Sequence, residues 1–101
     1  MKFRLSERAN TDVAEIYAYG YNQWGLRSAD RYFDGLFVAF DSIGTFPKAS
    51  REHRDLGDGI RLKVYRSHLI LYRIGESGIE ILRVVHGHYD WQTEILPNPN
   101  N

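Results

Sequence analysis

The chain has 101 residues, of which 43% are hydrophobic and 14% aromatic, so it can bury the core of one domain without disulfides or metal. It contains no cysteine, which excludes disulfides and thiolate metal sites and fits a reducing compartment. Its 13 basic and 13 acidic residues cancel, whereas proteins that bind nucleic acid directly usually carry a strong basic excess.

The first two predicted elements are a short strand and a helix. Polar and apolar residues alternate over residues 2–5, as in a strand. Ser6 is placed to cap the helix, and Gly25 stands where helices commonly end in a left-handed conformation. Gly20 inside this helix costs about 1 kcal/mol relative to alanine, which a close approach of another helix would explain. The positions expected to face the core are Ala9, Val13, Ile16, Tyr17, Gly20 and Trp24.

A second helix is predicted to follow at once. Ser28 can cap it, and Gly44 and Pro47 mark its end. Because only residues 25–27 join the two helices, we expect an antiparallel helical hairpin. A polar loop over residues 48–59 comes next. The positions of the second helix expected to face the core are Ala29, Tyr32, Phe33, Leu36, Phe40 and Ile43.

Three β-rich runs complete the domain. They cover residues 57–65, 69–74 and 79–91, and the short turns between them predict an antiparallel meander. The middle run is almost wholly apolar, as expected for a strand that is covered on both faces. The predicted order is therefore β-α-α-β-β-β, an α+β domain with the helical hairpin on a mainly antiparallel sheet. We expect one domain over residues 1–96 and a disordered tail over residues 97–101.

Several motifs recur together, in this order and spacing, in one known family. The helices contribute Trp24-Gly25 and Phe46-Pro47. The first β-rich run contributes Leu56-Gly57-Asp58-Gly59-Ile60-Arg61, which is similar to L-G-x-G-[IL]-R. The second run contributes His68-Leu69-Ile70-Leu71-Tyr72-Arg73, which is similar to H-x-I-x-Y-R. The third contributes Ile79-Glu80-Ile81-Leu82-Arg83-Val84-Val85-His86-Gly87, which is similar to I-E-I-x-R-V-x-H-G. On these motifs, residues 1–90 resemble the ParE branch of the RelE/ParE superfamily of bacterial toxins.

The resemblance implies the toxin component of a type II toxin–antitoxin system. ParE-like toxins mostly inhibit DNA gyrase by binding, and they are not known as enzymes, so no cofactor is expected. A cognate ParD-like antitoxin would neutralise the toxin in a hetero-oligomer and would link it to operator DNA only indirectly. The first residues lack the apolar segment of a signal peptide, and no run reaches the length of a membrane span. We therefore expect a cytoplasmic protein that does not engage a membrane.

Polar residues near the end of the last β-rich run support an alternative function, a RelE-type endonuclease that cuts mRNA on the ribosome. Cleavage of RNA through its own 2′-hydroxyl requires a base, an acid and a cation for the phosphate. The pair His88-Tyr89 resembles the ending of some ribonuclease members, whereas ParE-type chains usually have arginine at position 88. The candidate catalytic residues for this alternative are Arg61, Arg83, His86, His88 and Tyr89.

The same residues can also be interpreted as structural, and this interpretation argues against the endonuclease. Leu69 stands where the ribonucleases place an arginine, and His86-Gly87 of the ParE-type motif is intact. Arg83 shares a strand face with apolar neighbours and is expected to pair with Asp90 or Glu80, as a buried structural arginine. No catalytic residue is therefore favoured, and a metal site is not expected. The residues assigned a structural polar role are Arg83, His86 and Asp90.

Partner binding is assigned mainly to aromatic and apolar residues. Tyr19, Tyr21 and Phe37 fall outside the core-facing positions, so we expect them to be exposed and to suit an amphipathic antitoxin helix. An apolar patch after the last strand either folds over the sheet or contacts a partner. A third possibility is a decayed toxin that serves only as an antitoxin-binding co-repressor. The expected partner-binding residues are Tyr19, Tyr21, Phe37, Arg61, Trp91, Ile95 and Leu96.

Overall fold

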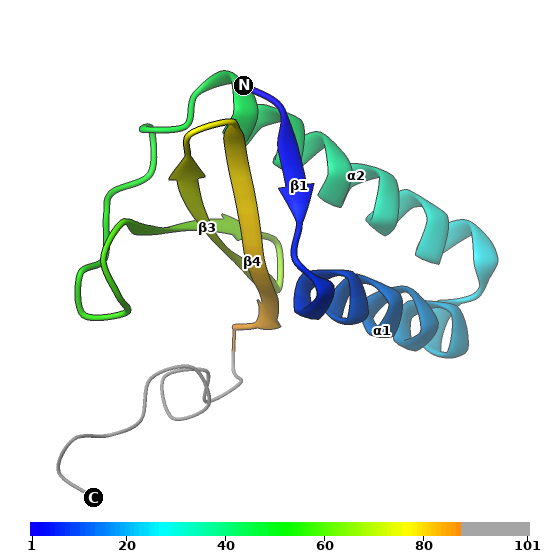
Figure 1. The fold of residues 1–101 in the computed structure, drawn as a ribbon. Helices are drawn as coiled ribbons and strands as arrows, with labels where there is room; N and C mark the ends of the chain where they lie inside the picture. The colour runs from blue at the N-terminus through cyan, green and yellow to red at the C-terminus, as the bar shows by residue number, and fades with distance from the viewer. Residues whose placement is uncertain (88–101) are drawn as a thin grey trace, which may run out of the picture.

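The computed structural model describes residues 1–87 and confirms the predicted order β-α-α-β-β-β (Figure 1). Two helices form a hairpin beside a single four-stranded sheet, so the domain is α+β as expected. Within the described residues, no helix is long and apolar enough to cross a membrane. The elements are β1 (Phe3–Leu5), α1 (Glu7–Trp24), α2 (Leu26–Thr45), β2 (Ile60–Tyr65), β3 (His68–Gly75) and β4 (Gly78–His86).

The sheet has the strand order β1-β4-β3-β2. Strands β2, β3 and β4 form the predicted antiparallel meander, with a register shift between Leu71 and Tyr72. The N-terminal strand β1 joins the sheet in parallel with β4, and Phe3 pairs with Ile79. Because β1 has only three residues and β4 has nine, β1 covers only the first part of the outer edge of β4.

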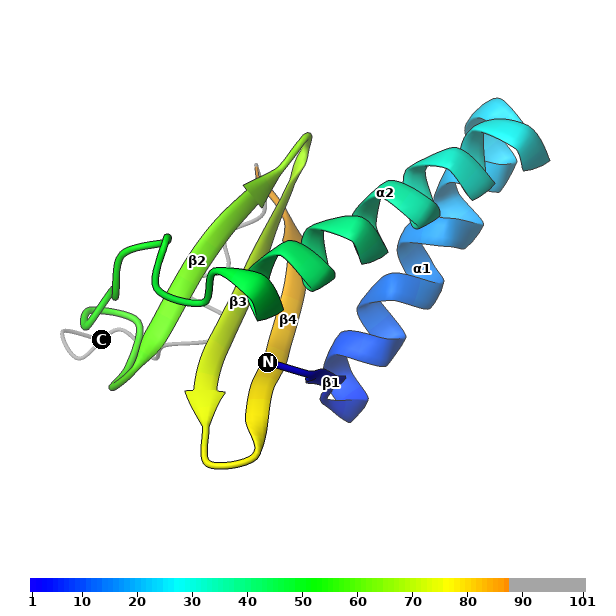
Figure 2. The same ribbon diagram turned by 90° about the horizontal axis from the view of Figure 1, so that it is seen from above.

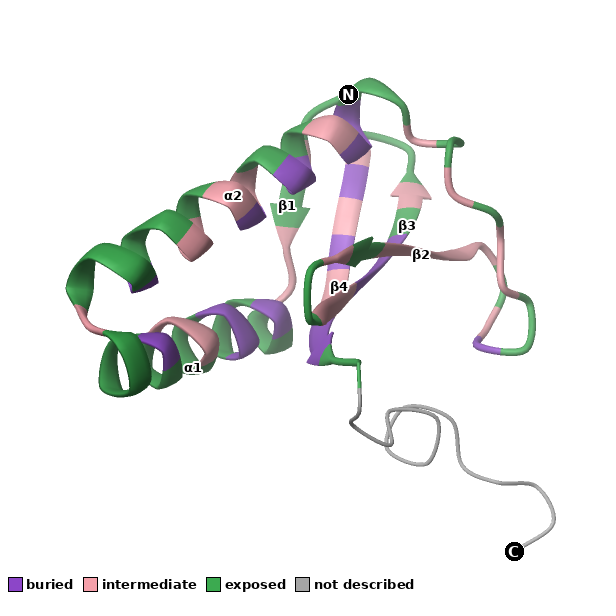
Figure 3. Cartoon of the chain, turned by 180° about the vertical axis from the view of Figure 1, so that it is seen from behind, coloured by how far each residue is buried: buried purple, intermediate pink, exposed green. Residues whose placement is uncertain are grey.

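The main core lies between the helical hairpin and one face of the sheet (Figure 3). Successive side chains of a strand point to opposite faces, so Ile70 and Tyr72 of β3 face the helices together. The hydroxyl of Tyr72 donates a hydrogen bond of 2.7 Å to the carbonyl of Pro47, which satisfies its polar end. The buried members of this core are Ala9, Val13, Leu36, Ala39, Phe40, Ile43, Ile70, Tyr72, Ile79, Ile81 and Val84.

A second, smaller core lies on the other face of the sheet. Leu71 of β3 and Val85 of β4 pack there against Leu56, which comes from the loop between α2 and β2. This loop is held against the sheet by Arg61, whose Nη1 donates a hydrogen bond of 2.6 Å to the carbonyl of Ser50. The central strand β3 is therefore covered on both faces, which confirms the expectation from its apolar sequence.

The helix ends follow the sequence signals except at the start of α2. Ser6 caps α1 as predicted, because its hydroxyl accepts the amide of Ala9 at 3.0 Å. The prediction that Ser28 caps α2 is wrong, since α2 begins at Leu26 and its first residue follows Gly25 directly. Gly25 adopts a φ of 89°, and this left-handed backbone reverses the chain within one residue.

Two predicted burial states need correction. Trp24 was expected in the core, but it is 66% exposed, because the tip of the hairpin extends past the described strands of the sheet (Figure 2). Phe37 was expected to be exposed, but it is half-buried and packs on the main core. Its ring lies 4.8 Å from that of Phe33 and 6.2 Å from that of Phe3 on β1. Strand β1 beneath α2 thus widens the buried face of that helix.

Gly20 lies where the two helices approach each other, as its place in the sequence predicted. It is buried, and a methyl group added there would lie 3.7 Å from both Cα and Cβ of Ala29 on α2. Such a distance is ordinary van der Waals contact, so the helices are close at this point but leave room for a methyl group.

Candidate functional site

A cleft of about 650 Å³ separates the helical hairpin from the end of the sheet where β2 turns into β3 and where β4 ends. One wall is the face of α1 that carries Ile16, Gly20 and Trp24, and part of α2. The opposite wall includes Arg66 and His68 at the β2–β3 turn. Figure 2 shows how the hairpin diverges from the sheet in this direction.

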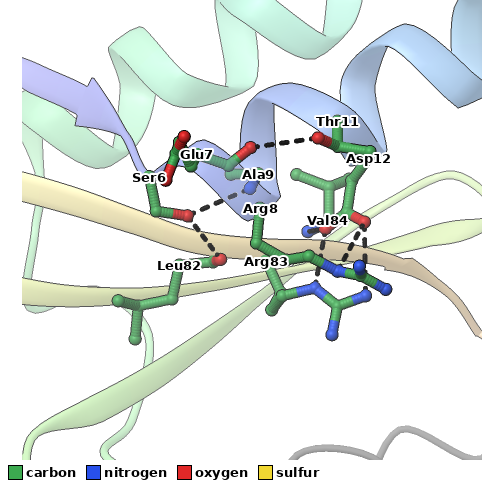
Figure 4. A network of polar contacts seen from close by, with 9 residues as sticks. All are labelled: Ser6, Glu7, Arg8, Ala9, Thr11, Asp12, Leu82, Arg83 and Val84. Carbon is green, nitrogen blue, oxygen red and sulfur yellow. Dashed lines mark hydrogen bonds and ion pairs between the residues drawn. The ribbon is translucent and has the colours of Figure 1, made fainter.

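A buried aspartate that lines this cleft joins α1 to β4 (Figure 4). Asp12 is only 6% exposed and accepts hydrogen bonds from Nε of Arg83 at 2.8 Å and from Nη2 at 3.2 Å. It also accepts the backbone amide of Val84 at 2.9 Å. Arg83 thus binds Asp12 of α1, and the prediction that it pairs with Glu80 is wrong, whereas its other predicted partner, Asp90, lies outside the described residues.

Asp12 can reach Arg83 and Val84 of β4 because β1 is short and leaves this part of the β4 edge to helix α1. Where β1 ends, the next residues take over the hydrogen bonding of the β4 edge (Figure 4). The amide of Ser6 donates to the carbonyl of Ile81 at 2.9 Å, and its hydroxyl donates to the carbonyl of Leu82, also at 2.9 Å. Further along α1, the carboxylate of Asp12 accepts the backbone amide of Val84. Side chains of α1 and its cap thus replace a strand along this edge.

Glu80, the other carboxylate considered for Arg83, bridges two different arginines. Its carboxylate lies 3.1 Å from Arg4 of β1 and 3.0 Å from Arg73 of β3. These three residues occupy one register position across neighbouring strands. The hydrogen bond from Arg73, with a further one from Arg4, lowers the pKa of Glu80.

A chain of aromatic rings closes the sheet end of the cleft. The hydroxyl of Tyr32 on α2 lies 2.6 Å from Nδ1 of His68, and the rings of His68 and His86 meet edge to face at 5.4 Å. Burial lowers the pKa of His68, and the charge of His86 acts in the same direction. Burial raises the pKa of Tyr32. Both groups are therefore uncharged at neutral pH, which suits a half-buried position.

The structure brings together only part of the predicted site. Arg83 and His86 both line the cleft, but Arg61 does not, and its guanidinium is bound to the carbonyl of Ser50. Within residues 1–87 no group of three or more histidine, cysteine or acidic side chains could hold a metal ion. The predicted residues His88, Tyr89, Asp90, Trp91, Ile95 and Leu96 lie outside the described residues.

The hairpin tip carries exposed aromatic residues. Tyr19 is 60% exposed and Tyr21 is 51% exposed, as the sequence predicted. Trp24 joins them, with its ring 5.7 Å from that of Tyr19. The sequence signal that could have revealed the α1 wall is a spacing of four residues, which places Arg8, Asp12, Ile16, Gly20 and Trp24 on one helix face.

Comparison with known proteins assigns the chain to a family. Residues 3–91 match the model of the family described as "ParE toxin of type II toxin-antitoxin system, parDE". The chain belongs to the ParE toxin family. It is 33% identical over 84 residues to Toxin ParE1 of Caulobacter vibrioides, covering 83% of this chain and 86% of that protein. It is 31% identical over 90 residues to Toxin ParE1 of Mycobacterium tuberculosis, covering 88% and 92%.

The fold of the ParE family is also found in a solved structure. A chain described as "Chromosomal ParDE TA system from P. aeruginosa" superposes with a TM-score of 0.74, over 85% of this chain and 95% of that one. The sequence identity is only 16%, so this likeness concerns the fold alone.

The ParE-type motifs of this chain lie mainly in its scaffold. In the first motif Leu56 is buried, and Gly57 and Gly59 have φ values of 141° and 75° that favour glycine. In the last motif Ile81 lies in the core and Arg83 binds Asp12. Most of these motifs therefore serve the fold of the chain, and most of them do not include the aromatic residues of the hairpin tip.

Proposed function

We propose that this ParE family member is a toxin that inhibits DNA gyrase by binding, and that a cognate ParD-like antitoxin neutralises it in the cytoplasm. Support comes from its relatives, which are named Toxin ParE1, and from its structural neighbour, which comes from a ParDE system. The antitoxin would form a hetero-oligomer with the toxin, and contact with operator DNA would pass through the antitoxin.

The observation that carries a binding mechanism is the state of Arg83. Two nitrogens of its guanidinium are bound by the buried carboxylate of Asp12, so this arginine is positioned by the fold. Arg61, the other cation offered for a phosphate, lies outside the cleft and is bound to Ser50. Of the described candidates for RNA cleavage, Arg83 and His86 line the cleft, but Arg61, the second cation proposed for the phosphate, does not join them there.

A second observation supports binding to a protein partner. Tyr19, Tyr21, Trp24 and Leu26 all lie at the hairpin tip, and each is more than half exposed. Aromatic side chains are enriched at protein interfaces, because they bury a large apolar area at a small cost in conformational entropy. An exposed cluster of such residues is typical of an interaction site.

The test is a supercoiling assay with purified gyrase and the purified toxin. We expect inhibition or trapped cleaved DNA, relief by the antitoxin, and the same inhibition by the His88→Ala/Tyr89→Ala variant. No effect on gyrase would contradict the proposal for this enzyme. Ribosome-dependent cleavage of mRNA that is lost in the double variant would favour the endonuclease instead.

A further inference from the structure

Charge is unevenly distributed over the fold, although basic and acidic residues cancel over the whole chain. Residues 7–45, which contain both helices, include three basic and six acidic residues. Residues 46–66, which contain the loop after α2, strand β2 and the start of the next turn, include six basic and three acidic ones. Strand β2 is the last strand of the sheet, and Figure 2 shows it and the loop on the side away from α1. The domain therefore has an acidic side and a basic side.

The cations of the basic side follow one edge of the sheet. Residues of the loop lie beside the start of β2, because Glu52 forms a β-bridge with Arg61, and Arg61 binds the carbonyl of Ser50 at 2.6 Å. Arg51 is therefore placed at the start of β2, and Arg66 follows its last residue. Five steps along an extended strand separate these two ends by about 17 Å. We call the three exposed cations of this region the basic edge, and they are Lys48, Arg51 and Arg66.

The three cations of the basic edge are available to a partner. All are exposed, and none of them forms an ion pair within residues 1–87. The acidic residues of the same region all fall within residues 52–58, and one of them, Glu52, lies 3.6 Å from Arg54. The basic edge therefore keeps three positive charges that the described fold does not neutralise.

Arg66 has an unfavourable backbone conformation. Its φ is 50°, and within residues 1–87 it is the one residue other than glycine with a positive φ. Glycine would adopt this turn at no steric cost. Strained residues concentrate at functional positions, and what arginine adds here is a guanidinium, which lies 5.9 Å from the ring centroid of Tyr65. The strain therefore supports a role for this cation outside the fold.

We propose that the basic edge binds the phosphate backbone of duplex DNA, so that the toxin contacts DNA held by gyrase as well as the enzyme. The part that concerns gyrase rests on the proposed function. A row of cations suits phosphates, which need charge and little apolar contact. Protein partners are held mainly by buried apolar anchors, and residues 46–66 expose only two large apolar side chains, Phe46 and Val64. A length of about 17 Å spans about five base pairs, and the acidic helices would turn away from the DNA.

The first test measures the Kd of the full-length toxin for a short fluorescent duplex over a range of salt concentrations. Three phosphate contacts predict a slope of about −3 for the logarithm of the association constant against that of salt concentration. Lys48→Glu/Arg51→Glu should weaken binding at least about tenfold at low salt and make the slope less steep by about 2. Lys2→Glu/Arg27→Glu is the matched control, because both residues are exposed outside the basic edge. Its Kd should stay within about twofold.

The second test separates the charge of Arg66 from its place in the turn. Arg66→Gly should not lower the urea midpoint, because glycine accepts the left-handed backbone. The same variant should bind the duplex about threefold or more weakly, and its salt slope should be less steep by about 1. Unchanged binding to the duplex would remove Arg66 from the proposed site.

The third test compares gyrase alone with gyrase bound to DNA. DNA should raise the affinity of labelled toxin for gyrase about tenfold or more, because a second linked contact adds to the first. Lys48→Glu/Arg51→Glu should remove this gain and leave the Kd for gyrase alone within about twofold of that of the unaltered toxin. Circular dichroism confirms that each variant is folded.

The outcomes separate this inference from the gyrase proposal. If the toxin binds no duplex and DNA does not raise its affinity for gyrase, the inference is wrong even where gyrase is inhibited. If it binds the duplex with the expected slope but does not affect gyrase, the basic edge stands as a DNA site and the proposed function is wrong. If the variants weaken binding to gyrase equally with and without DNA, the basic edge meets an acidic protein surface, and the assignment to DNA is overturned.

Discussion

The two ends of helix α1 are built from different chemistry. At its start, Ser6 and Asp12 use their polar groups to hold the helix against the edge of β4. At its end, Tyr19 and Trp24 leave their rings exposed beyond the sheet. From this difference we propose that the start of the helix serves stability and its end serves recognition. Substitutions should therefore separate the two properties along a single element.

The largest effect on stability is expected for Asp12→Ala, which tests the start of α1. The change leaves the largely buried guanidinium of Arg83 and the amide of Val84 without this acceptor. Removal of one partner of a buried ion pair typically costs about 3–5 kcal/mol of unfolding free energy. Urea unfolding measures it, with Asp12→Leu/Arg83→Met as the paired variant that should recover part of the loss. A cost below about 1 kcal/mol would contradict the structural role.

A smaller effect is expected from Ser6→Ala at the same end. The variant loses the cap on the amide of Ala9 and the hydrogen bond to Leu82, but keeps the backbone bond to Ile81. Loss of such a cap costs about 1–2 kcal/mol. Ser6→Thr retains the hydroxyl and should lose less, and equal losses for the two variants would show that the hydroxyl does not matter.

Gly20→Ala probes the middle of the helix and should act in the opposite direction. The added methyl group meets Ala29 at ordinary contact distance, and alanine favours the helix over glycine. We expect a gain of up to about 1 kcal/mol in unfolding free energy. Gly35→Ala is the contrasting variant, because there a methyl group would collide with the hydroxyl of Tyr65. A loss of stability in Gly20→Ala would mean that the helices cannot accept the methyl group.

His68, which faces the helices from the sheet, makes stability depend on pH. Because burial and His86 lower its pKa in the folded state, the unfolded chain takes up its proton first as the pH falls. This contribution to stability is full above the unfolded pKa of about 6.5 and declines below it. Urea midpoints between pH 8 and 5 should show this fall in the unaltered chain and in His53→Gln. His68→Gln should flatten it, and an equal fall in all three would exclude His68 as the source.

Trp24→Ala should have the smallest effect on stability and completes the comparison. Its ring contacts Tyr19 but is mostly exposed, so we expect a change within about 0.5 kcal/mol in urea unfolding. The same variant should strongly weaken antitoxin binding. A large loss of stability would show that the hairpin tip also holds the fold, and the two ends of α1 would then not differ as described.

Much of the fold could be predicted, because its signals are local. The cap at Ser6, the glycine at the end of α1 and the apolar run of β3 each act over a few residues. The candidate site was predicted less well. The carboxylate of Asp12 and the side chain of Arg83 are 71 positions apart in the chain, and no spacing rule joins them.

The sequence by itself determined the element order and the α+β class, because hydrophobic periodicity shows which residues face the core and which face solvent. It also determined the ParE family, through the order and spacing of its motifs. Tertiary structure alone decided that Phe37 is covered and Trp24 is not. Both lie on amphipathic helices, but Phe3 of β1 packs against Phe37. Trp24 is the last residue of α1, and the hairpin tip extends past the sheet (Figure 2). Burial depends on what a helix face meets, and that is set by contacts between segments far apart in sequence.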